Sequence, residues 1–370
     1  MKAARFKFYP TLRQRRQLAK ELGHSRYVFN WALKAKSDLY KESGVGATRF
    51  QLSGMLTELK KETEWLKEAS STVLSETIED LDSGFQRFFK KLARYPRRKK
   101  YRTAQSCRYT LDKRQTKIFK DGEILKLPKL GACKLKWTSP VDVFPNTATV
   151  SRDSCGRWFI SLQFDSQIKP DIPKTCQEIG LDLGLKDLVV TSEGEKIKPK
   201  KVYNKMYKTL KRRARHLSKA RKKSKNRIKK KLRVARVHSK IANRRKDDLH
   251  KLSTSLVRRY RLIACEDLSV QSMSRKGSKI KRKFNRAVRD CSWRQLRTFL
   301  EYKSKWYERE LMVIPRFQRS TGVCPDCGEQ VDLSLKDRSW TCPKCLKEHD
   351  RDIAAAKVIL GIARSARTVA

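Results

Sequence analysis

The first quarter of the chain changes from strand-like to helix-like spacing of its apolar residues. Residues 5–10 (RFKFYP) alternate charged and aromatic side chains, as a short strand does, and Pro10 then interrupts the pattern. Thr11 suits a helix N-cap, and apolar positions recur every three or four residues from there to about residue 95. The pattern predicts one strand followed by a helical segment, which ends at a basic loop, 95–102.

The period changes to two between about residues 105 and 170. Short runs such as TATVSR and WFISLQF alternate apolar and polar residues, and turn residues such as Ser154 and Gly156 separate them. We expect an antiparallel sheet or small barrel in this region. The opening strand is expected to join it, with the helical segment inserted between the two.

The second half of the chain predicts a mixed sheet. IGLDLG (179–184) is an apolar strand that carries one acid, and 187–197 predicts two further short strands around a Ser-Glu-Gly turn. YRLIACEDLSV (260–270) is another apolar strand that ends in acids. The remaining predicted elements are a basic loop at 275–286, a helix at 292–311, a strand at 312–316 and a final helix at 352–366, capped by Asp352.

The charge balance of the chain points to a polyanionic partner. Lys and Arg number 90 against 38 Asp and Glu, a formal net charge of +52. A compact chain with that charge repels itself unless counter-charge is supplied, and nucleic acid supplies it through its phosphates. The alternatives are an anionic membrane surface or a ribosome-like structural role. No apolar run approaches the ~20 residues that span a bilayer, so we expect no membrane partner.

The most basic stretch, 201–246, keeps helical spacing. Residues 211–236 contain no acid, yet Leu210, Leu217 and Ile228 continue an apolar stripe. Such a run is usually a solvated face or a disordered tail. The retained stripe instead favours an ordered hairpin of two helices, turning near Ser224, that contacts nucleic acid.

Chain length and cysteine content limit the number of domains and the roles of the cysteines. A chain of 370 residues suits two or three domains, and its 38% of apolar residues allows compact cores. The N-terminus lacks the apolar run of a secretory signal, so we expect a cytoplasmic protein without disulfides. Six of its ten cysteines have no partner spacing and are interpreted as ordinary thiols in strands and helices: Cys107, Cys133, Cys155, Cys176, Cys265 and Cys291.

The other four cysteines have the spacing of a metal site. Cys324 and Cys327 form one CxxC pair and Cys342 and Cys345 a second, with fourteen residues between the pairs. Two thiolates on each tight turn can point at one ion, and four complete a tetrahedral zinc site. Trp340 supplies a small apolar plug. The site is closed, so we expect one structural Zn²⁺; the alternative, a redox pair, explains a doubled motif poorly.

Three carboxylates stand where carboxylates are costly to bury. Asp182 lies within an apolar strand, Glu266 ends another, and Asp352 begins the last helix. Singly, each has an ordinary explanation, as a turn acid, a strand-end acid or a helix N-cap. Together, on one mixed sheet and a late helix, they fit an oxygen-ligand site for two Mg²⁺ ions (Mn²⁺ is possible) roughly 3.5–4 Å apart, which could activate a water for phosphodiester cleavage.

A series of motifs runs in order through nearly the whole chain: FKFYPT, YVFNW, YPRRKK, IGLDLGLKDLVVTSEGEKI, IACEDLSV, CPDCG…SWTCPKC and HDRDIAAA. In these motifs the chain resembles the TnpB family, the RNA-guided DNA nucleases of insertion sequences that are related to small type V CRISPR effectors. The resemblance implies an α+β multidomain fold: a WED-like β-barrel (1–10 and 96–173) interrupted by a helical REC domain (11–95), an RNase H-like RuvC nuclease domain (174–318 and 350–370, containing the basic hairpin 201–246), and a zinc-binding finger, or ribbon (319–349).

The resemblance also implies partners and an activity. It implies a monomer that binds a guide RNA derived from the transposon end. This complex would cleave double-stranded target DNA beside a short adjacent motif, in a Mg²⁺-dependent reaction that displaces one strand. Sequence would be read by pairing between guide and target, with the protein testing only the short motif.

The resemblance assigns roles to the three acids. Asp182, Glu266 and Asp352 stand at the family's metal-ligand positions, whereas the neighbouring acids Asp187, Asp267 and Asp350 receive lesser roles. One position departs from the family pattern, because Ala354 replaces an Asn that could hydrogen-bond beside the active site. This departure supports one rival interpretation, a cleavage-deficient RNA-guided repressor. A second rival, an RNA-binding transposition accessory protein whose acids are structural, also stays open.

Basic residues in both halves of the chain are candidates for nucleic-acid contact. Those in the second half could form walls or lids of a channel for single-stranded DNA, or bind guide RNA only. The candidates are Arg5, Lys7, Arg26, Arg97, Arg98, Lys99, Lys100, Lys211, Arg212, Arg213, Arg221, Lys222, Lys223, Lys281, Arg282 and Lys283.

Overall fold

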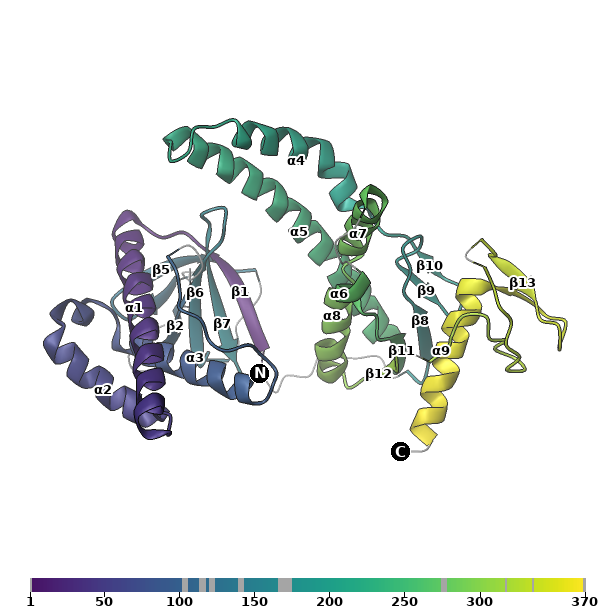
Figure 1. The fold of residues 1–370 in the computed structure, drawn as a ribbon, viewed down its shortest axis with the longest axis horizontal. Helices are drawn as coiled ribbons and strands as arrows, with labels where there is room; N and C mark the ends of the chain where they lie inside the picture. Colours follow the sequence, from purple (N-terminus) through teal and green to yellow (C-terminus); the bar gives the residue numbers. More distant parts are fainter. Residues whose placement is uncertain are drawn as a thin grey trace. The chain divides into compact units, whose positions relative to one another are not determined.

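The chain folds into two compact units, Met1–Gln167 and Ile168–Ala370. Figure 1 shows the computed structural model. It describes residues 2–101, 106–112, 118–119, 124–138, 143–165, 175–273, 278–316, 318–334 and 336–368. Among these residues, no helix is long and apolar enough to cross a membrane.

Helices fill the first part of unit 1. Thr11 caps the first helix in a reciprocal capping box with Gln14, and Gly44 ends it in the left-handed conformation, with φ of 70°. Val28, Ala32 and other apolar residues of this helix pack against the two that follow. The helices are α1 (Leu12–Ser43), α2 (Arg49–Glu62) and α3 (Ser71–Phe89), with a short 3₁₀ turn at Glu64–Glu68. The predicted helical segment is thereby confirmed.

The rest of unit 1 is an antiparallel sheet that forms a half-barrel (Figure 1). The opening strand pairs with two strands that follow the helices, so the helices are an insertion into the sheet, as the sequence predicts. The strands are β1 (Lys2–Phe8), β2 (Ser106–Thr110), β3 (Ile118–Phe119), β4 (Ile124–Leu127), β5 (Gly131–Lys136), β6 (Thr147–Arg152) and β7 (Trp158–Phe164), in the order β2-β6-β7-β1-β5-β4-β3.

One face of α1 closes the core of this sheet. Leu18 and Leu22 are buried against apolar side chains of the strands. The buried Glu21 accepts a 2.5 Å hydrogen bond from the hydroxyl of Tyr109 on β2, and burial raises the pKa of this carboxyl. Gln14 donates to backbone carbonyls beside β5. Because these polar groups are paired, their burial does not carry the full desolvation cost.

Unit 2 is built on a mixed five-stranded sheet, as predicted. The strand that carries Asp182, the strand that carries Glu266 and the last strand of the sheet pair in parallel. The two strands that follow Asp182 in the chain continue the sheet on the other side as an antiparallel meander. The strands are β8 (Glu178–Asp182), β9 (Val189–Thr191), β10 (Lys196–Ile197), β11 (Leu262–Glu266) and β12 (Glu310–Ile314), in the order β10-β9-β8-β11-β12.

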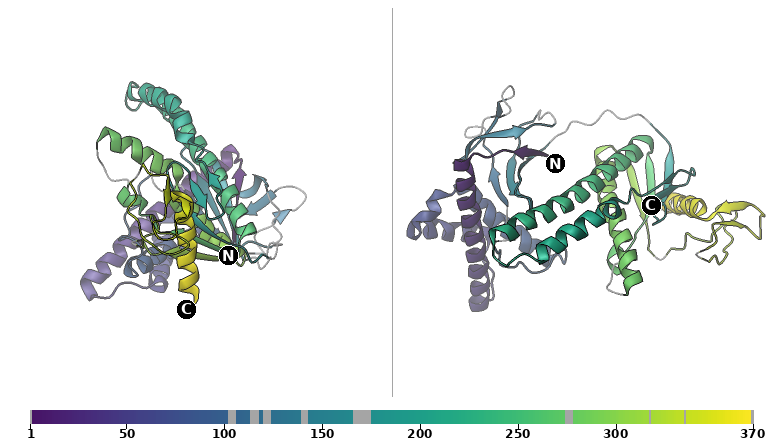
Figure 2. Two further views of the ribbon diagram at one scale, coloured as in Figure 1. Left: turned by 90° about the vertical axis from the view of Figure 1, so that its right-hand side faces the viewer. Right: turned by 90° about the horizontal axis from the view of Figure 1, so that it is seen from above.

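Helices pack against this sheet. The last helix contacts β8 closely at Gly180, where a Cβ atom would lie 2.0 Å from the carbonyl oxygen of Ala356. Two helices, α4 and α5, lie side by side as a long hairpin around a small core that includes Leu210 and Ile241 (Figures 1 and 2). The helices are α4 (Val202–Ser218), α5 (Lys225–Arg259), α6 (Val270–Met273), α7 (Lys279–Cys291), α8 (Trp293–Trp306) and α9 (Arg351–Thr368). A small hairpin, β13 (Ser339–Thr341) and β14 (Glu348–Asp350), precedes α9.

Three predicted elements were wrong in detail. The basic loop at 275–286 is largely the helix α7, because Ser278 caps it and Val288 and Cys291 bury one face. The helix predicted at 292–311 ends at Trp306, and the following strand begins earlier than expected, at Glu310. Cys155 and Cys176 lie outside strands and helices, whereas the other four unpaired cysteines lie within them.

Candidate carboxylate site and four-cysteine centre

Two of the three predicted acids lie at one edge of the unit 2 sheet. Leu181 of β8 pairs with Cys265 of β11 in parallel register, so the next residues, Asp182 and Glu266, end adjacent strands. The carboxyl ends of parallel strands meet at the same edge of a sheet. The topology therefore places both acids there.

The third acid comes from the first turn of α9. The carboxylate of Asp350 accepts 3.1 Å hydrogen bonds from the backbone N–H groups of Asp352 and Ile353. Asp350 is therefore the N-cap, and the prediction that Asp352 caps this helix was wrong. The ordinary explanation for Asp352 disappears with that correction, because its carboxylate is not used to cap the helix.

The three acids act on one another electrostatically. Burial, and then the charges of Glu266 and Asp352, raise the pKa of Asp182 to about 7, against which the backbone N–H of Leu183 acts only in part. The carboxylate oxygens of Asp182, Glu266 and Asp352 do not all lie within 4.8 Å of one another, unlike the sulfur atoms of the four clustered cysteines. Two further carboxylates that raise the pKa of Asp182 favour a bound cation at this site.

Side chains that the sequence analysis did not single out hold two of these acids. The hydroxyl of Ser320 donates to Glu266, with 2.5 Å between the oxygens. Asp352 accepts from Arg351 at 3.1 Å and forms an ion pair with Arg338 at 3.6 Å. No spacing in the sequence pairs Arg338 or Ser320 with an acid, so only the fold could reveal them.

A cavity of about 700 Å³ opens beside Glu266. Arg294, Arg297 and Arg316 contribute to its lining, with Trp293 and Ser269 among the other residues. Two of these arginines, Arg297 and Arg316, are held by the carboxylate of Asp267. The cavity thus places cationic side chains next to a carboxylate, an arrangement that suits a phosphodiester approaching a metal.

The acids given lesser roles have identifiable structural partners or settings. Asp267 organises the two arginines, and Asp350 caps α9 and pairs with Lys196 at 2.5 Å. Asp187 is buried in the loop between β8 and β9.

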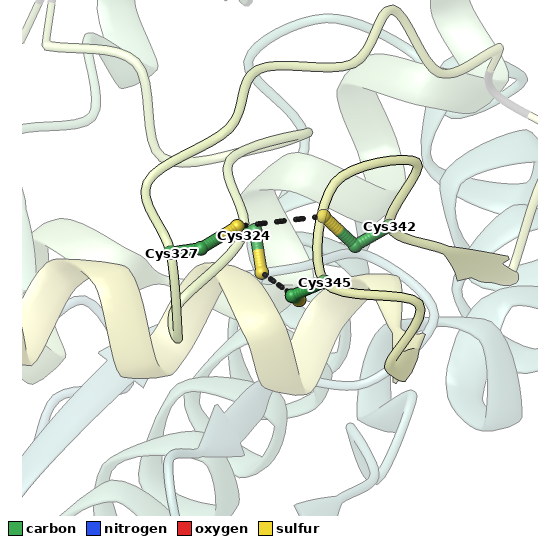
Figure 3. A group of neighbouring side chains, drawn as sticks. All are labelled: Cys324, Cys327, Cys342 and Cys345. Carbon is green, nitrogen blue, oxygen red and sulfur yellow. Dashed lines mark hydrogen bonds between the residues drawn. The ribbon is translucent and has the colours of Figure 1, made fainter.

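The four cysteines converge, as Figure 3 shows. The sulfur atoms of Cys324 and Cys345 lie 3.6 Å apart, and those of Cys327 and Cys342 lie 3.5 Å apart. All four lie within 4.8 Å of one another. The backbone N–H of Cys345 is the main cause that lowers the pKa of the Cys342 thiol to about 7, which favours a thiolate. Four sulfur donors placed this close together fit one tetrahedral zinc ion.

His349 is a neighbour of this centre that the spacing of cysteines did not reveal. Its Nε2 lies 3.3 Å from the sulfur of Cys324 and 3.6 Å from a carboxylate oxygen of Asp326. Trp340 packs in the apolar cluster of the centre, as expected for a plug, and Ala354 of α9 packs there too. Ala354 therefore lies against the four-cysteine centre.

The basic candidates of unit 1 differ in their surroundings. Arg5 and Lys7 are exposed on one face of β1, and the Arg5 guanidinium lies 3.9 Å from the centre of the Phe159 ring. Lys99 is half-buried over Phe29, and burial lowers its pKa. Arg26 lies over the ring of Tyr101. The exposed candidates of the loop that follows α3 are Arg97, Arg98 and Lys100.

In unit 2 most candidates lie on the α4–α5 hairpin. Those that are exposed lie on α4 and at the turn: Lys211, Arg212, Arg221, Lys222 and Lys223. Arg213 is half-buried and donates to the carbonyl of Arg233 on α5, so it also ties the two helices together. Lys281 is exposed on α7, while the side chains of Arg282 and Lys283 lie outside the described residues.

Fold and site together define a two-unit α/β protein with two acids at a sheet edge, a third on the last helix, and a cluster of four thiols. Three family models match: "Probable transposase" (OrfB of IS605) over residues 161–277, "Cas12f1-like, TNB domain" over 293–359 and "Helix-turn-helix domain" over 1–44. In this structure the last range holds β1 and one uninterrupted helix, α1.

Relatives match over nearly the full chain. A "putative RNA-guided DNA endonuclease" of Streptomyces pristinaespiralis is 38% identical over 99% of this chain and 90% of the relative. The protein of the same description named InsQ, from Escherichia coli K12, is 30% identical over 97% of this chain and 92% of its own length. The chain belongs to the TnpB family.

A solved structure shares the fold. The Cas12f1 chain of a complex with single guide RNA and target DNA, determined by cryo-electron microscopy, aligns with 93% of this chain and 82% of its own, with a TM-score of 0.56 and 15% identity.

Proposed function

We propose that this protein is an RNA-guided DNA endonuclease, in which Asp182, Glu266 and Asp352 form the cutting site. The observation that carries the proposal is that Asp182 and Glu266 end adjacent strands, and that the charges of Glu266 and Asp352 help to raise the pKa of Asp182 to about 7. A fold rarely keeps three mutually repelling carboxylates together unless a cation binds there. The names of the relatives supply the substrate class.

The residues fit Mg²⁺, because all three donors are carboxylate oxygens, the hard ligands that this ion prefers. When bound, two ions would supply an activated water and stabilise the leaving oxygen of a phosphodiester. Asp182 and Glu266 would be fixed by their strands, and Asp352 by the cap that Asp350 provides to α9. Arg294, Arg297 and Arg316 would bind the phosphates of the strand in the adjacent cavity.

We assign the roles of the two units according to the domains expected from the sequence. In this proposal, the half-barrel and helices of unit 1 would be the WED-like and REC-like domains, and the sheet and four-cysteine segment of unit 2 would be the RuvC-like domain and the zinc finger. The exposed basic residues of both units would bind guide RNA and target DNA, with the protein acting as a monomer. Zinc, held by Cys324, Cys327, Cys342 and Cys345, would be structural.

The test begins with the RNA that co-purifies when the gene is expressed with its native flanking DNA. DNA matched to that RNA should be cut with Mg²⁺ and left intact with EDTA. Asp182→Ala should lose cutting by at least about a hundredfold while keeping the RNA, because it removes a metal ligand and no phosphate contact. Asp187→Ala, at a nearby buried acid outside the proposed triad, is the matched control. Cutting by Asp182→Ala at the wild-type rate would reject the site.

The repressor alternative rested on Ala354. That side chain packs with Cys324, Trp340 and Cys342 rather than among the cavity-lining residues beside Glu266. We therefore propose the active nuclease. A discrete bound RNA, with guided DNA binding but without cutting by the wild-type protein, would instead support the repressor.

A further inference from the structure

A small cavity in unit 1 combines guanidinium groups with aromatic rings. Its volume is about 200 Å³, and none of the described residues that line it is acidic. The lining residues are Arg15, Ala19, Leu22, Arg26, Tyr101, Arg152, Gly156 and Trp158. Three positive side chains around so small a space, without a carboxylate among the lining residues, favour an anionic group.

Three separate segments build the cavity. Helix α1 supplies Arg15 and Arg26, three turns apart, and the end of β6 supplies Arg152. The turn that follows contains Gly156, whose φ of 77° is in the left-handed region; a Cβ atom there would lie 3.5 Å from Nη2 of Arg152. Glycine therefore suits the turn conformation and leaves the space beside this guanidinium open.

Two guanidinium groups lie over the rings. The Cζ atom of Arg26 is 5.1 Å from the centre of the Tyr101 ring, and that of Arg152 is 5.6 Å from the Trp158 ring. Trp158 is only 8% exposed and belongs to the core, whereas Tyr101 is 73% exposed. The cavity thus has one ring fixed in the core and a second whose surface is accessible to a ligand.

The Arg15 side chain is oriented by the backbone. Its Nε donates a 3.2 Å hydrogen bond to the carbonyl of Pro10, a contact that does not use the terminal nitrogens of the guanidinium. A planar guanidinium can contact two oxygens of one phosphate at once.

We propose that this cavity binds one unpaired nucleotide of RNA, with its base stacked on Tyr101 and its phosphate held by Arg15 and Arg152. The proposal rests on the proposed function, and it specifies an unpaired nucleotide as the part of the RNA that binds to unit 1. A duplex is far too large for the space. Unpaired RNA bases, in contrast, are commonly recognised by stacking on aromatic rings and on arginine planes.

The test compares the full-length variants Tyr101→Ala and Arg152→Gln with the wild-type protein. The probes are a fluorescent RNA transcribed from the native flanking DNA and a single-stranded DNA of the same sequence. Tyr101→Ala should weaken RNA binding about tenfold without changing its salt dependence, because stacking carries no charge. Arg152→Gln should weaken it and reduce the slope of log K against log salt by about 1.

The controls are Tyr40→Ala, which removes an exposed tyrosine elsewhere on α1, and Arg16→Gln, which removes a charge next to Arg15 but outside the cavity. Chemical probing of the bound RNA should show one unpaired base that becomes reactive in both cavity variants and in neither control. Wild-type affinity and protection in both cavity variants would overturn the proposal while leaving the nuclease function standing.

Two further outcomes are decisive. Loss of affinity for the DNA probe alone would assign the cavity to a DNA strand and overturn the proposal for RNA. A wild-type protein that binds no RNA would overturn the proposed function, and this inference with it.

Discussion

Asp182 shows how one buried side chain can link metal binding to stability. Its pKa in the folded, metal-free protein is about 7, against an ordinary value of 3.8. Between these values an unfolded chain has lost the proton that the folded chain keeps. The free energy of unfolding therefore falls as pH rises through this window and stays low above it.

We expect Asp182→Asn to stabilise the metal-free protein, because the amide cannot ionise. The gain should be about 1–3 kcal/mol at pH 8 and clearly smaller at pH 5. Urea unfolding in EDTA at both pH values measures it. Mg²⁺ should then stabilise the wild-type protein at pH 8 and have much less effect on the variant. An equal gain at pH 5 and pH 8 would show that the ionisation of Asp182 is not the cause.

At the residue scale, sequence reasoning succeeded where spacing carries the information. The two CxxC pairs predicted a thiol cluster that the structure confirms. The prediction that Asp352 caps α9 was wrong, because Asp350 and Asp352 both lie near the start of the helix and only their hydrogen bonds show that Asp350 is the cap. Arg338 and His349 were missed because each contact depends on how the chain folds back from a distant segment.

At the scale of elements, the contact between β8 and α9 decides where the third acid lies. A Cβ atom at Gly180 would come within 2.0 Å of the Ala356 backbone oxygen, and backbone cannot move aside as a side chain can. The helix must therefore shift for any larger residue to fit. Since Asp352 lies one turn from Ala356, this shift would move the acid relative to Asp182.

We expect Gly180→Ala to destabilise the protein by about 1–3 kcal/mol and to reduce cutting. Gly361→Ala is the matched control, since it changes a glycine of α9 with nothing within 4 Å of the added carbon. Because alanine suits a helix better, the control should be stabilised by about 0.4–1 kcal/mol. Thermal unfolding measures both. Equal stability of the two variants would mean that α9 does not approach β8 this closely.

The four-cysteine centre gives a second prediction at this scale. Cys342→Ser should lose bound zinc, measured by elemental analysis, and should make the segment around β13 and β14 easier to cleave in limited proteolysis. Cys176→Ser, at an exposed cysteine outside the cluster, should keep its zinc. Full zinc content in Cys342→Ser would exclude the four-thiol site.

Sequence patterns located most elements, because the spacing of apolar residues shows which face of a helix or strand is buried. An element with few apolar residues gives a weak pattern and is missed. Helix α7 was taken for a loop because basic residues dominate its first half, and the few apolar residues that anchor it, such as Val288, come late. The cavity beside Glu266 could not be predicted, since it depends on residues from several elements.

For the whole molecule, the formal charge of +52 is the dominant fact. Without nucleic acid, like charges on each unit repel one another, and dissolved salt screens that repulsion over a Debye length of roughly 10 Å at 0.1 M. Folding should therefore become more favourable as ionic strength rises, the opposite of a protein held together by surface ion pairs.

We expect the melting temperature of the RNA-free protein to rise by several degrees between about 50 mM and 500 mM NaCl, at about 2–4 °C per kcal/mol. RNA should produce a similar rise at low salt, because it binds the folded state. Differential scanning calorimetry measures both effects. A melting temperature that falls with salt would show that attractive ion pairs outweigh the repulsion.

The position of α9 has a consequence for the order in which activities arise. Ribosomes add roughly 5–20 residues each second, and N-terminal domains generally fold first. The half-barrel, the basic hairpin and the strands that bear Asp182 and Glu266 are all made before Asp352. On the proposed function, a nascent chain could grip RNA well before it can cut DNA. A message broken before the codon for Asp352 would then yield an RNA binder rather than a nuclease.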